Sequence, residues 1–282
     1  MQGFPDKSLA CKKFNRIAPS FNQHAFLHND IRAQLLSRIK EIAIDPKIIH
    51  DSGCGTGQAC VSLNQEFPDA KVFGTDISKN MINEANKLML PDHVKFLSGD
   101  IESMVLEQRP DLIFSNLAFH WCNPMILLKH WANSLNENGA LLFSTFGPNN
   151  LLELQNAWRQ IDQGIHVHPS LSPEDLTRLM QNCGYSDVVV DVEHIPIEYG
   201  SLEQLWKDLK NTASSNTILG RPNGLTSKQK WTRFLDILLS APKPYVHNIE
   251  IVYVLAKFQP SKSVETVKDI LIQVDSILTR NM

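Results

Sequence analysis

Residues 47–145 alternate between short apolar runs and segments with helical periodicity, and this alternation constrains the fold more than any other feature of the sequence. Apolar runs begin near residues 47, 71, 94, 111 and 140, and turn signals such as Asn138-Gly139 separate them from the helical segments. Strands that alternate with helices pair in parallel, and the helices cover both faces of the sheet. The pattern therefore predicts an α/β fold with a mostly parallel sheet.

The segments on either side of this core have other patterns. Residues 1–29 contain two prolines and predict an arm with one short helix. Residues 30–43 place Ile31, Leu35, Ile39 and Ile42 at helical spacing behind Asp30, a suitable N-cap. Beyond residue 148 we expect two more strands, which complete a seven-stranded sheet, and five helices: strands at 187–198 and 249–258, helices in 149–162, 172–183 and 262–279, and two helices in 201–239.

Composition excludes several classes of protein. The formal net charge of −3 argues against a general nucleic-acid binder. The five cysteines are scattered without a C-x-x-C pair, so we expect reduced thiols in a cytoplasmic protein and no zinc site. His166 and His168 are a poor metal pair because no further ligands lie nearby in the sequence. No apolar run reaches the roughly 18 residues that a membrane-spanning helix needs.

A glycine loop follows the first expected strand. It reads Asp51-x-Gly53-x-Gly55-x-Gly57, and glycines at such a turn allow the backbone to approach a ligand closely. A dinucleotide-binding loop requires G-x-G-x-x-G, whereas Gln58 stands at the position that would complete that pattern. The spacing therefore argues against an NAD-type site.

The acid beside this loop favours a ligand without phosphate. Asp51 would repel a pyrophosphate but can accept a hydrogen bond from an amino group. S-adenosylmethionine (SAM) has an amino acid moiety, a ribose and a sulfonium cation, and no phosphate. A tight β–α turn that binds no ligand remains the alternative.

Two further acids follow the second and third expected strands. Asp76 lies 19 residues after Gly57, where a carboxylate can accept both ribose hydroxyls, although an ordinary acid at a helix N-terminus also fits. Asp100 is placed to accept from an adenine amino group. Ile77 and Ile101 are candidates to sandwich the adenine ring, and core packing explains either isoleucine equally well.

Taken together, these elements resemble the class I methyltransferases over roughly residues 14–160, which implies a Rossmann-like fold and SAM as cofactor. A narrower resemblance is to the malonyl-[acyl-carrier protein] O-methyltransferases of biotin synthesis. The segments that carry it are FNRIAPSFNQHA, SGDIES, DLIFSNLAFHWC, LLFSTFGPNNLLEL, AWRQID and LWKDLKNTASSNTILGR. Two departures stand out, because the family usually has Tyr in place of Phe21 and Gln in place of His120.

The resemblance implies methyl transfer to the free carboxylate of a malonyl thioester on acyl carrier protein. It divides the chain into four parts: an arm over the cofactor (1–29), a SAM-binding core (30–164), a helical insertion that forms a lid and binds the acceptor (165–248), and a final strand with a C-terminal helix (249–282). Arg16 and Phe21 of the arm, and Asn116 of the core, are expected cofactor contacts.

The expected chemistry needs little from the protein. A carboxylate is already an anion at neutral pH, so no general base is required, and no catalytic triad is visible. Positioning and exclusion of water then carry the catalysis. A substrate carboxylate favours a clamp by arginine, for which Arg221 is the first candidate and Arg16 and Arg159 are lesser ones. A solvated loop arginine explains Arg221 equally well.

His120 and Trp121 follow the fourth expected strand, at the sheet edge where such folds bind ligands. Either side chain can line an acceptor pocket, and a methyltransferase for a hydroxyl would use His120 as its base. A hydrogen-bonded histidine and a packing tryptophan are the alternatives; Trp158 is expected to pack.

Residues 201–233 carry six basic and two acidic side chains, in contrast to the acidic whole. This local excess of positive charge predicts an acidic partner such as acyl carrier protein, or else a solvated helical face.

Two other functions remain open at this stage. One is a methyltransferase for a small diffusible acceptor, such as a carboxylic acid or a quinone precursor. The other is a SAM-binding module without catalysis. The sequence does not indicate an oligomeric state.

Overall fold

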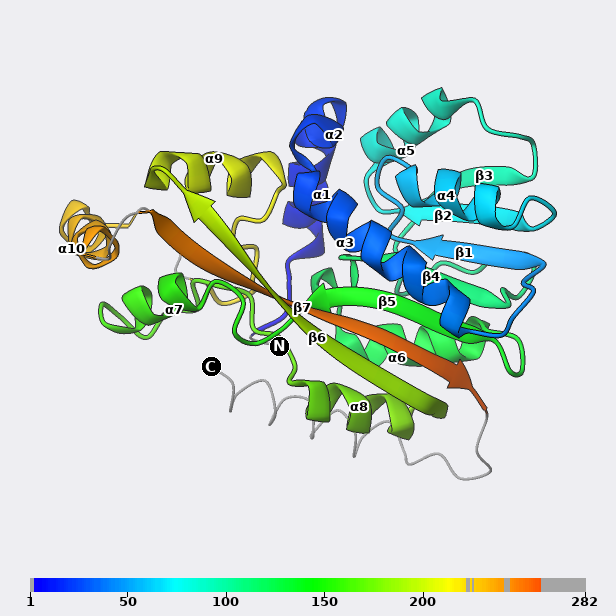
Figure 1. The fold of residues 1–282 in the computed structure, drawn as a ribbon. Helices are drawn as coiled ribbons and strands as arrows, with labels where there is room; N and C mark the ends of the chain where they lie inside the picture. The colour runs from blue at the N-terminus through cyan, green and yellow to red at the C-terminus, as the bar shows by residue number, and fades with distance from the viewer. Residues whose placement is uncertain (1–2, 222–223, 225, 241–243, 260–282) are drawn as a thin grey trace.

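The computed structural model describes residues 3–221, 224, 226–240 and 244–259, which form a seven-stranded sheet flanked by helices (Figure 1). The strand order is β3-β2-β1-β4-β5-β7-β6. Strands β1 to β5 pair in parallel, and β7 runs antiparallel to both β5 and β6. The predicted seven-stranded, mostly parallel sheet is confirmed. Its strands are β1 (Ile48–Ser52), β2 (Lys71–Asp76), β3 (Val94–Ser98), β4 (Leu112–Asn116), β5 (Ala140–Phe146), β6 (Tyr185–Tyr199) and β7 (Tyr245–Phe258).

Helices cover both faces of this sheet, as predicted. The α-helices are α1 (Lys7–Ile17), α2 (Phe21–His24), α3 (Phe26–Ser37), α4 (Gln58–Glu66), α5 (Lys79–Ala85), α6 (Pro124–Ser134), α7 (Leu152–Arg159), α8 (Pro173–Asn182), α9 (Leu202–Asn211) and α10 (Lys228–Leu239). Short 3-10 helices occur at η1 (Ala18–Ser20), η2 (Arg38–Glu41), η3 (Asn86–Leu88) and η4 (Phe119–Trp121). Ser78 and Ser172 cap α5 and α8 through their side chains.

The central strands are buried on both faces, which explains why they read as continuous apolar runs. On β4, Leu112 and Phe114 belong to a core shared with α3 and α4. Ile113, between them, belongs to a second core shared with α6 and α8. The alternation follows from the twofold period of a strand, which points successive side chains to opposite faces.

Strands β6 and β7 extend past the rest of the sheet. Strand β5 ends where Phe146 pairs with Ile251, but the pairing of β6 with β7 continues to Tyr199 and Tyr245. Residues 200–244, with α9 and α10, connect the far ends of this two-stranded ribbon (Figure 1). The ribbon therefore holds the two helices beyond the carboxyl edge of the sheet.

The N-terminal region has more helix than the sequence indicated. Helices α1 and α2 occupy the segment where one short helix was expected. Helix α3 begins at Phe26 after Ala25, so the prediction that Asp30 caps this helix is wrong. Ala25 is buried and leaves a break of one residue after α2, and Asp30 is an exposed residue one turn inside α3. The predicted apolar face is confirmed, because Ile31, Leu35, Ile39 and Ile42 are all buried.

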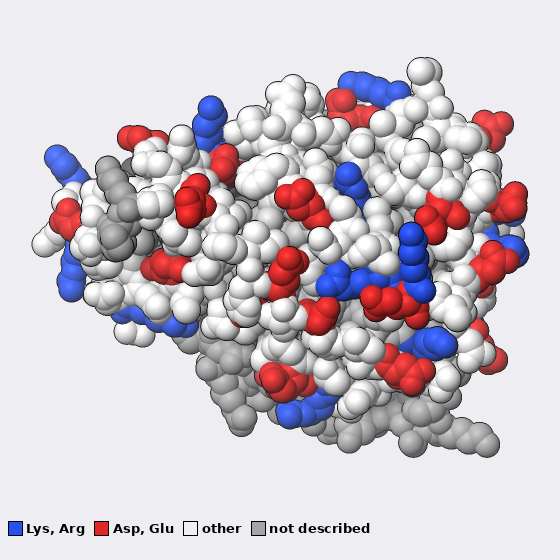
Figure 2. Space-filling view, in the orientation of Figure 1, with Lys and Arg blue, Asp and Glu red and all other residues white. Residues whose placement is uncertain are grey.

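On the face shown in Figure 2, acidic and basic side chains are interspersed, and both kinds project in the region of α9 and α10. None of the helices described is long and apolar enough to cross a membrane. The helix predicted at 262–279 lies outside the described residues.

Candidate active site

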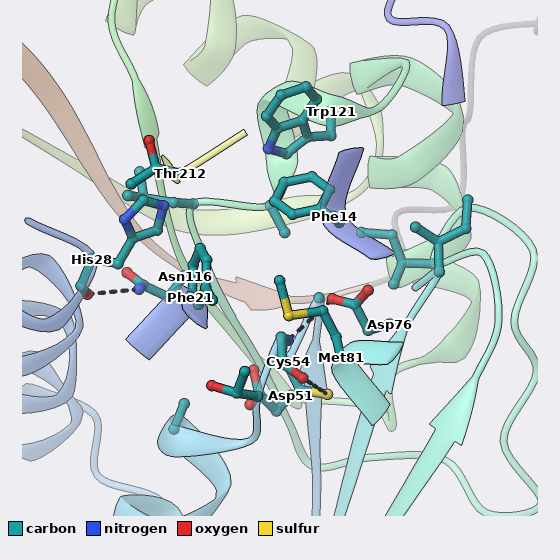
Figure 3. Close-up of a pocket in the computed structure, with 18 of the residues that line it drawn as sticks. Phe14, Phe21, His28, Asp51, Cys54, Asp76, Met81, Asn116, Trp121 and Thr212 are labelled. Carbon is teal, nitrogen blue, oxygen red and sulfur yellow. Dashed lines mark hydrogen bonds between the residues drawn. The ribbon is translucent and has the colours of Figure 1, made fainter. Parts of the chain in front are cut away.

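A first cavity opens at the carboxyl ends of β1, β2 and β4, and α1 to α3 close it from the opposite side (Figure 3). It has a volume of about 1120 Å³ out to its mouth. Residues from separate segments meet there because the carboxyl ends of parallel strands share one edge of the sheet. The predicted site residues that line it are Phe21, Asp51, Gly53, Gly55, Asp76, Ile77, Asp100, Ile101, Asn116, His120 and Trp121.

The glycine loop turns the chain sharply between β1 and α4. Gly53 has a φ of +85°, and a Cβ atom added there would lie 2.3 Å from the Cβ atom of Ala118. Gly57 has a φ of +80°, and its added Cβ would lie 2.7 Å from the ring of Phe96. Both positions therefore require glycine on two grounds, backbone conformation and space. Gly57 does not line the cavity; it packs behind the loop.

Asp51 is the most unusual group in the first cavity. The residue is 1% exposed, and its Oδ2 accepts a hydrogen bond from Sγ of Cys60 at 3.2 Å. Oδ1 has no hydrogen-bond partner among the described residues. Burial raises the pKa of Asp51 from 3.8 to about 7. A buried carboxyl oxygen without a donor is costly unless a ligand satisfies it, so this wall of the cavity is suited to a cationic amino group.

Asp76 holds the glycine loop against the second strand. Its two carboxyl oxygens accept from the backbone N–H of Gly55 at 3.0 Å and of Ser78 at 2.8 Å. Burial raises its pKa to about 6. Each carboxyl oxygen has a second lone pair, so Asp76 can still accept from a ligand.

Asp100 connects the core to helix α1. Both of its oxygens accept from Nζ of Lys7, at 2.6 and 2.7 Å, and the same ammonium lies 2.8 Å from Glu102. This ion pair holds α1 over the cavity. Asn116 also joins the core to the helical cover, because its Nδ2 donates to the backbone oxygen of His28 at 3.0 Å.

Comparison with known proteins identifies the family. A family described as "Methyltransferase domain" matches residues 49–139. The malonyl-[acyl-carrier protein] O-methyltransferase of Nitrosospira multiformis is 32% identical over 249 residues, which cover 82% of this chain and 81% of the relative. The chain belongs to the malonyl-[acyl-carrier protein] O-methyltransferase family. Another member of the family, malonyl-[acyl-carrier protein] O-methyltransferase 1 of Coxiella burnetii, is 29% identical to this chain. The match covers 98% of this chain and 97% of that relative.

Solved structures show the same fold. The plantazolicin methyltransferase BpumL in complex with SAH superposes with a TM-score of 0.53 at 18% identity, covering 89% of this chain and 94% of that one. As a member of the malonyl-[acyl-carrier protein] O-methyltransferase family, the protein is a SAM-dependent methyltransferase, as predicted. The first cavity fits that cofactor, because the unpartnered oxygen of Asp51 suits its amino group and the loop has no space for a side chain at Gly53.

A second cavity, of about 1650 Å³ when the space open to solvent is included, adjoins the first, between the β6–β7 ribbon and helices α7, α9 and α10. Residues from α3, from the strand edge and from the insertion line both cavities: His28, His120, Trp121, Phe146, Thr212 and Ser214. The two spaces therefore share a wall.

His120 lies in this shared wall. Its Nδ1 is buried and has no hydrogen-bond partner among the described residues. Burial, together with the neighbouring rings of His168 and His28, lowers the pKa of His120 well below 6.5. The imidazole is therefore neutral at physiological pH. Beside it, the ring of Trp121 meets the ring of Phe14 on α1 edge to face, with 5.1 Å between the ring centroids.

The three arginines singled out in the sequence line neither of these two cavities. Arg221 is half-buried, and its Nη1 donates to the backbone oxygen of Ile218 at 3.1 Å. Arg16 is exposed on α1, and Arg159 is exposed on α7. The structure instead places Arg32 of α3 in the wall of the first cavity.

The two histidines considered for metal binding have different partners. His166 stacks on Trp158 at 3.8 Å and contacts Asp162 at 2.7 Å. His168 accepts from the backbone N–H of Thr217 at 3.2 Å. Across the described part of the chain, no group of three His, Cys, Asp or Glu side chains is placed to hold a metal ion.

The N-terminal arm and the insertion contact each other directly. The backbones of Gly3 and Phe4 pair with Leu219, and the N–H of Asp6 donates to Thr217 at 2.7 Å. Farther along the arm, Nζ of Lys13 donates to the oxygens of residues 215 and 216. The two segments therefore close the cavities together.

Several lining residues were missed from the sequence: Lys7, Phe14, His28, Arg32, Met81, Thr212 and Ser214. Most of them lie on α1, α3 or the insertion, far along the chain from the glycine loop. For Lys7, the available signal was its positive charge, which could pair with one of the acids at the strand ends. The others have no local signature, because their role depends on how the helices pack over the strand ends.

Proposed function

We propose that this enzyme transfers the methyl group of SAM to the free carboxylate of malonyl-[acyl-carrier protein] in the cytoplasm. The observation that carries the proposal is 32% identity, over 82% of the chain, to an enzyme of that name. The two adjoining cavities support it, since one has the groups expected for the donor and the other is open to an acceptor.

The first cavity supplies a group for each part of the cofactor. We propose that Asp51 accepts from the amino group, Asp76 from the ribose hydroxyls, and Asp100 from the adenine amino group through lone pairs not used by Lys7. Ile77 and Ile101 would then flank the adenine ring. Asn116, Phe21 and the loop backbone at Gly53 and Gly55 would complete the contacts.

The reaction requires orientation more than acid–base chemistry. Bound SAM supplies a methyl group attached to a positively charged sulfur that leaves readily. The malonyl carboxylate is already ionised, so no side chain has to remove a proton. The neutral ring of His120 can donate one hydrogen bond to that carboxylate without repelling the sulfonium charge. Trp121 and Phe146 exclude water from the same wall.

The exposed basic side chains of the insertion support an acidic carrier as partner. Lys207 and Lys210 of α9, and Lys228 and Arg233 of α10, are exposed. Lys210 also lines the second cavity. A carrier that docks there would direct its thioester into this opening, and the opposite charges would speed the encounter. We further propose that Arg221 clamps the carboxylate when the carrier is docked.

The direct test is methyl transfer from labelled SAM to malonyl-[acyl-carrier protein], with the acetyl carrier as the matched substrate that lacks a free carboxylate. We expect a base-labile methyl ester on the malonyl carrier only. SAH binding without any ester on the malonyl carrier would overturn the proposal.

Charge reversal tests the docking surface. The double variant Lys228→Glu/Arg233→Glu should raise the KM for the carrier at least about tenfold at low salt and leave the KM for SAM unchanged. Lys95→Glu, on the exposed edge strand β3, is the control. Arg221→Gln tests the clamp through the same pair of KM values; if the carrier KM does not change, Arg221 is not the clamp.

A further inference from the structure

The second cavity is larger and more apolar than a malonyl group alone requires. Four of the five tryptophans of the chain line it: Trp121, Trp158, Trp206 and Trp231. Leucine and isoleucine side chains from α7, α9 and β7 fill the spaces between them. The wall also contains one aspartate and one lysine, Asp208 and Lys210. A malonyl group has one methylene, so it leaves nearly all of this apolar wall unused.

Two polar atoms that have no partner in the described part of the chain lie at the end of the second cavity that meets the first cavity. The Nδ1 atoms of His28 and His120 are buried there without hydrogen-bond partners among the described residues. At the opposite end, between α9 and α10, the ring centroid of Trp206 lies 5.9 Å from that of Trp231 and 6.0 Å from that of Phe234. Hydrogen-bond donors at one end and aromatic rings at the other suit a ligand with a polar head and an apolar tail.

We propose that the second cavity binds an alkyl chain, and that the enzyme also methylates the carboxylate of free medium-chain monocarboxylic acids. The carboxylate lies in the shared wall beside His120, and the chain extends toward Trp206. A carboxylate oxygen forms a bond to the methyl carbon as the bond from that carbon to sulfur breaks. The electron pair of the broken bond stays on sulfur, SAH leaves as a neutral thioether, and no proton is transferred.

Chain length is the variable that tests the proposal. Burying one methylene strengthens binding about fourfold when burial is complete. The kcat/KM for acetate, hexanoate, octanoate and decanoate should therefore rise with length, by at least about tenfold from hexanoate to decanoate. Methyl esters are measured by gas chromatography with labelled SAM. A specificity constant that does not depend on length, or the absence of ester from every free acid, overturns the proposal.

Tryptophan fluorescence gives a readout that is independent of turnover. Four of the five tryptophans line the cavity, so decanoate should shift the emission to shorter wavelength as it displaces water, and acetate should not. Decanoate binding that produces no ester refutes the proposed activity.

A filled cavity provides the matched variant. Leu209→Trp on α9 adds a ring inside the second cavity and should reduce the kcat/KM for decanoate at least about tenfold. Leu239→Trp on α10 is the control, because Leu239 is 53% exposed and does not line the cavity. SAH binding to both variants, measured by calorimetry, shows whether the fold is intact. Equal activity of the two variants on decanoate contradicts the proposal.

The test also separates this inference from the proposed function. Malonyl-[acyl-carrier protein] is assayed with the same enzyme preparation. Ester on the malonyl carrier without decanoate binding overturns the alkyl site alone. Ester from decanoate without ester on the malonyl carrier overturns the carrier proposal and leaves the alkyl site standing.

Discussion

Replacing Asp51 by Asn should stabilise the ligand-free protein at pH 8 while weakening cofactor binding. Burial raises the pKa of Asp51 from 3.8 to about 7. At 1.36 kcal/mol for each pKa unit, the ionised group therefore costs the folded protein about 4 kcal/mol at pH 8. Asparagine has no charge to bury, but its amide N–H groups need acceptors, which offsets roughly 1–3 kcal/mol. We expect a net gain of about 1–3 kcal/mol for the variant.

The pKa shift of Asp51 determines at which pH the variant is more stable than the parent protein. The pKa of Asp51 is higher in the folded than in the unfolded protein, so its contribution to stability is complete below pH 3.8 and is lost as pH rises through about 7. The advantage of Asp51→Asn should therefore appear between pH 5 and pH 8. At pH 8 the expected rise in Tm is about 2–8 °C, and at pH 5 the variant should match or fall below the parent protein.

Cofactor binding should change in the opposite direction. A hydrogen bond from an amino group to a charged carboxylate contributes roughly 1.5–3 kcal/mol, so SAH affinity should fall about tenfold to 100-fold in the variant. In the parent protein, SAH affinity should increase from pH 6 to pH 8 as Asp51 ionises, and the variant should lose that dependence.

Thermal unfolding at the two pH values and titration calorimetry with SAH measure both effects. Asp92→Asn, at an exposed residue before β3, controls for the change in net charge. A variant that is less stable than the parent protein at pH 8, or that binds SAH with unchanged affinity, would refute the reasoning about this carboxyl.

Three further substitutions probe the loop, the ribose acid and the arm. Gly53→Ala should lower the free energy of unfolding in urea by at least about 2 kcal/mol, because the new Cβ meets Ala118 and the backbone has a positive φ; unchanged stability would contradict the close approach. Asp76→Ala should reduce SAH affinity in calorimetry at least about tenfold, and Asp76→Asn should retain part of it; full affinity in the alanine variant excludes a ribose contact. Lys7→Met should raise the KM for SAM about two- to tenfold and speed proteolysis of the arm, whereas Lys12→Met, exposed on the same helix, should do neither. An effect of equal size in both lysine variants would show that the ion pair is not responsible.

Local patterns in the sequence were sufficient for the core of the fold. The period of each strand and helix depends on residues a few positions apart, so the buried runs at β4 and β5 could be recognised without knowledge of their neighbours. The glycine loop was predicted for the same reason, since positive φ values at Gly53 and Gly57 are a property of a single turn. Asp30 shows where this reasoning ends. It had the right residue type for a cap, but the start of α3 depends on α2, which packs before it.

The sequence by itself therefore determined the α/β class, the seven strands and the acids at the strand ends, because each follows from spacing along the chain. Only the tertiary structure decided what lies opposite those acids. Lys7 meets Asp100 across 93 positions, and Arg221 donates to the backbone instead of lining a cavity. The second cavity likewise exists only because β6 and β7 extend beyond β5 and hold α9 and α10 apart from the sheet edge. Such contacts depend on how far long strands project and how helices pack, and these are properties of the assembled chain that no local pattern records.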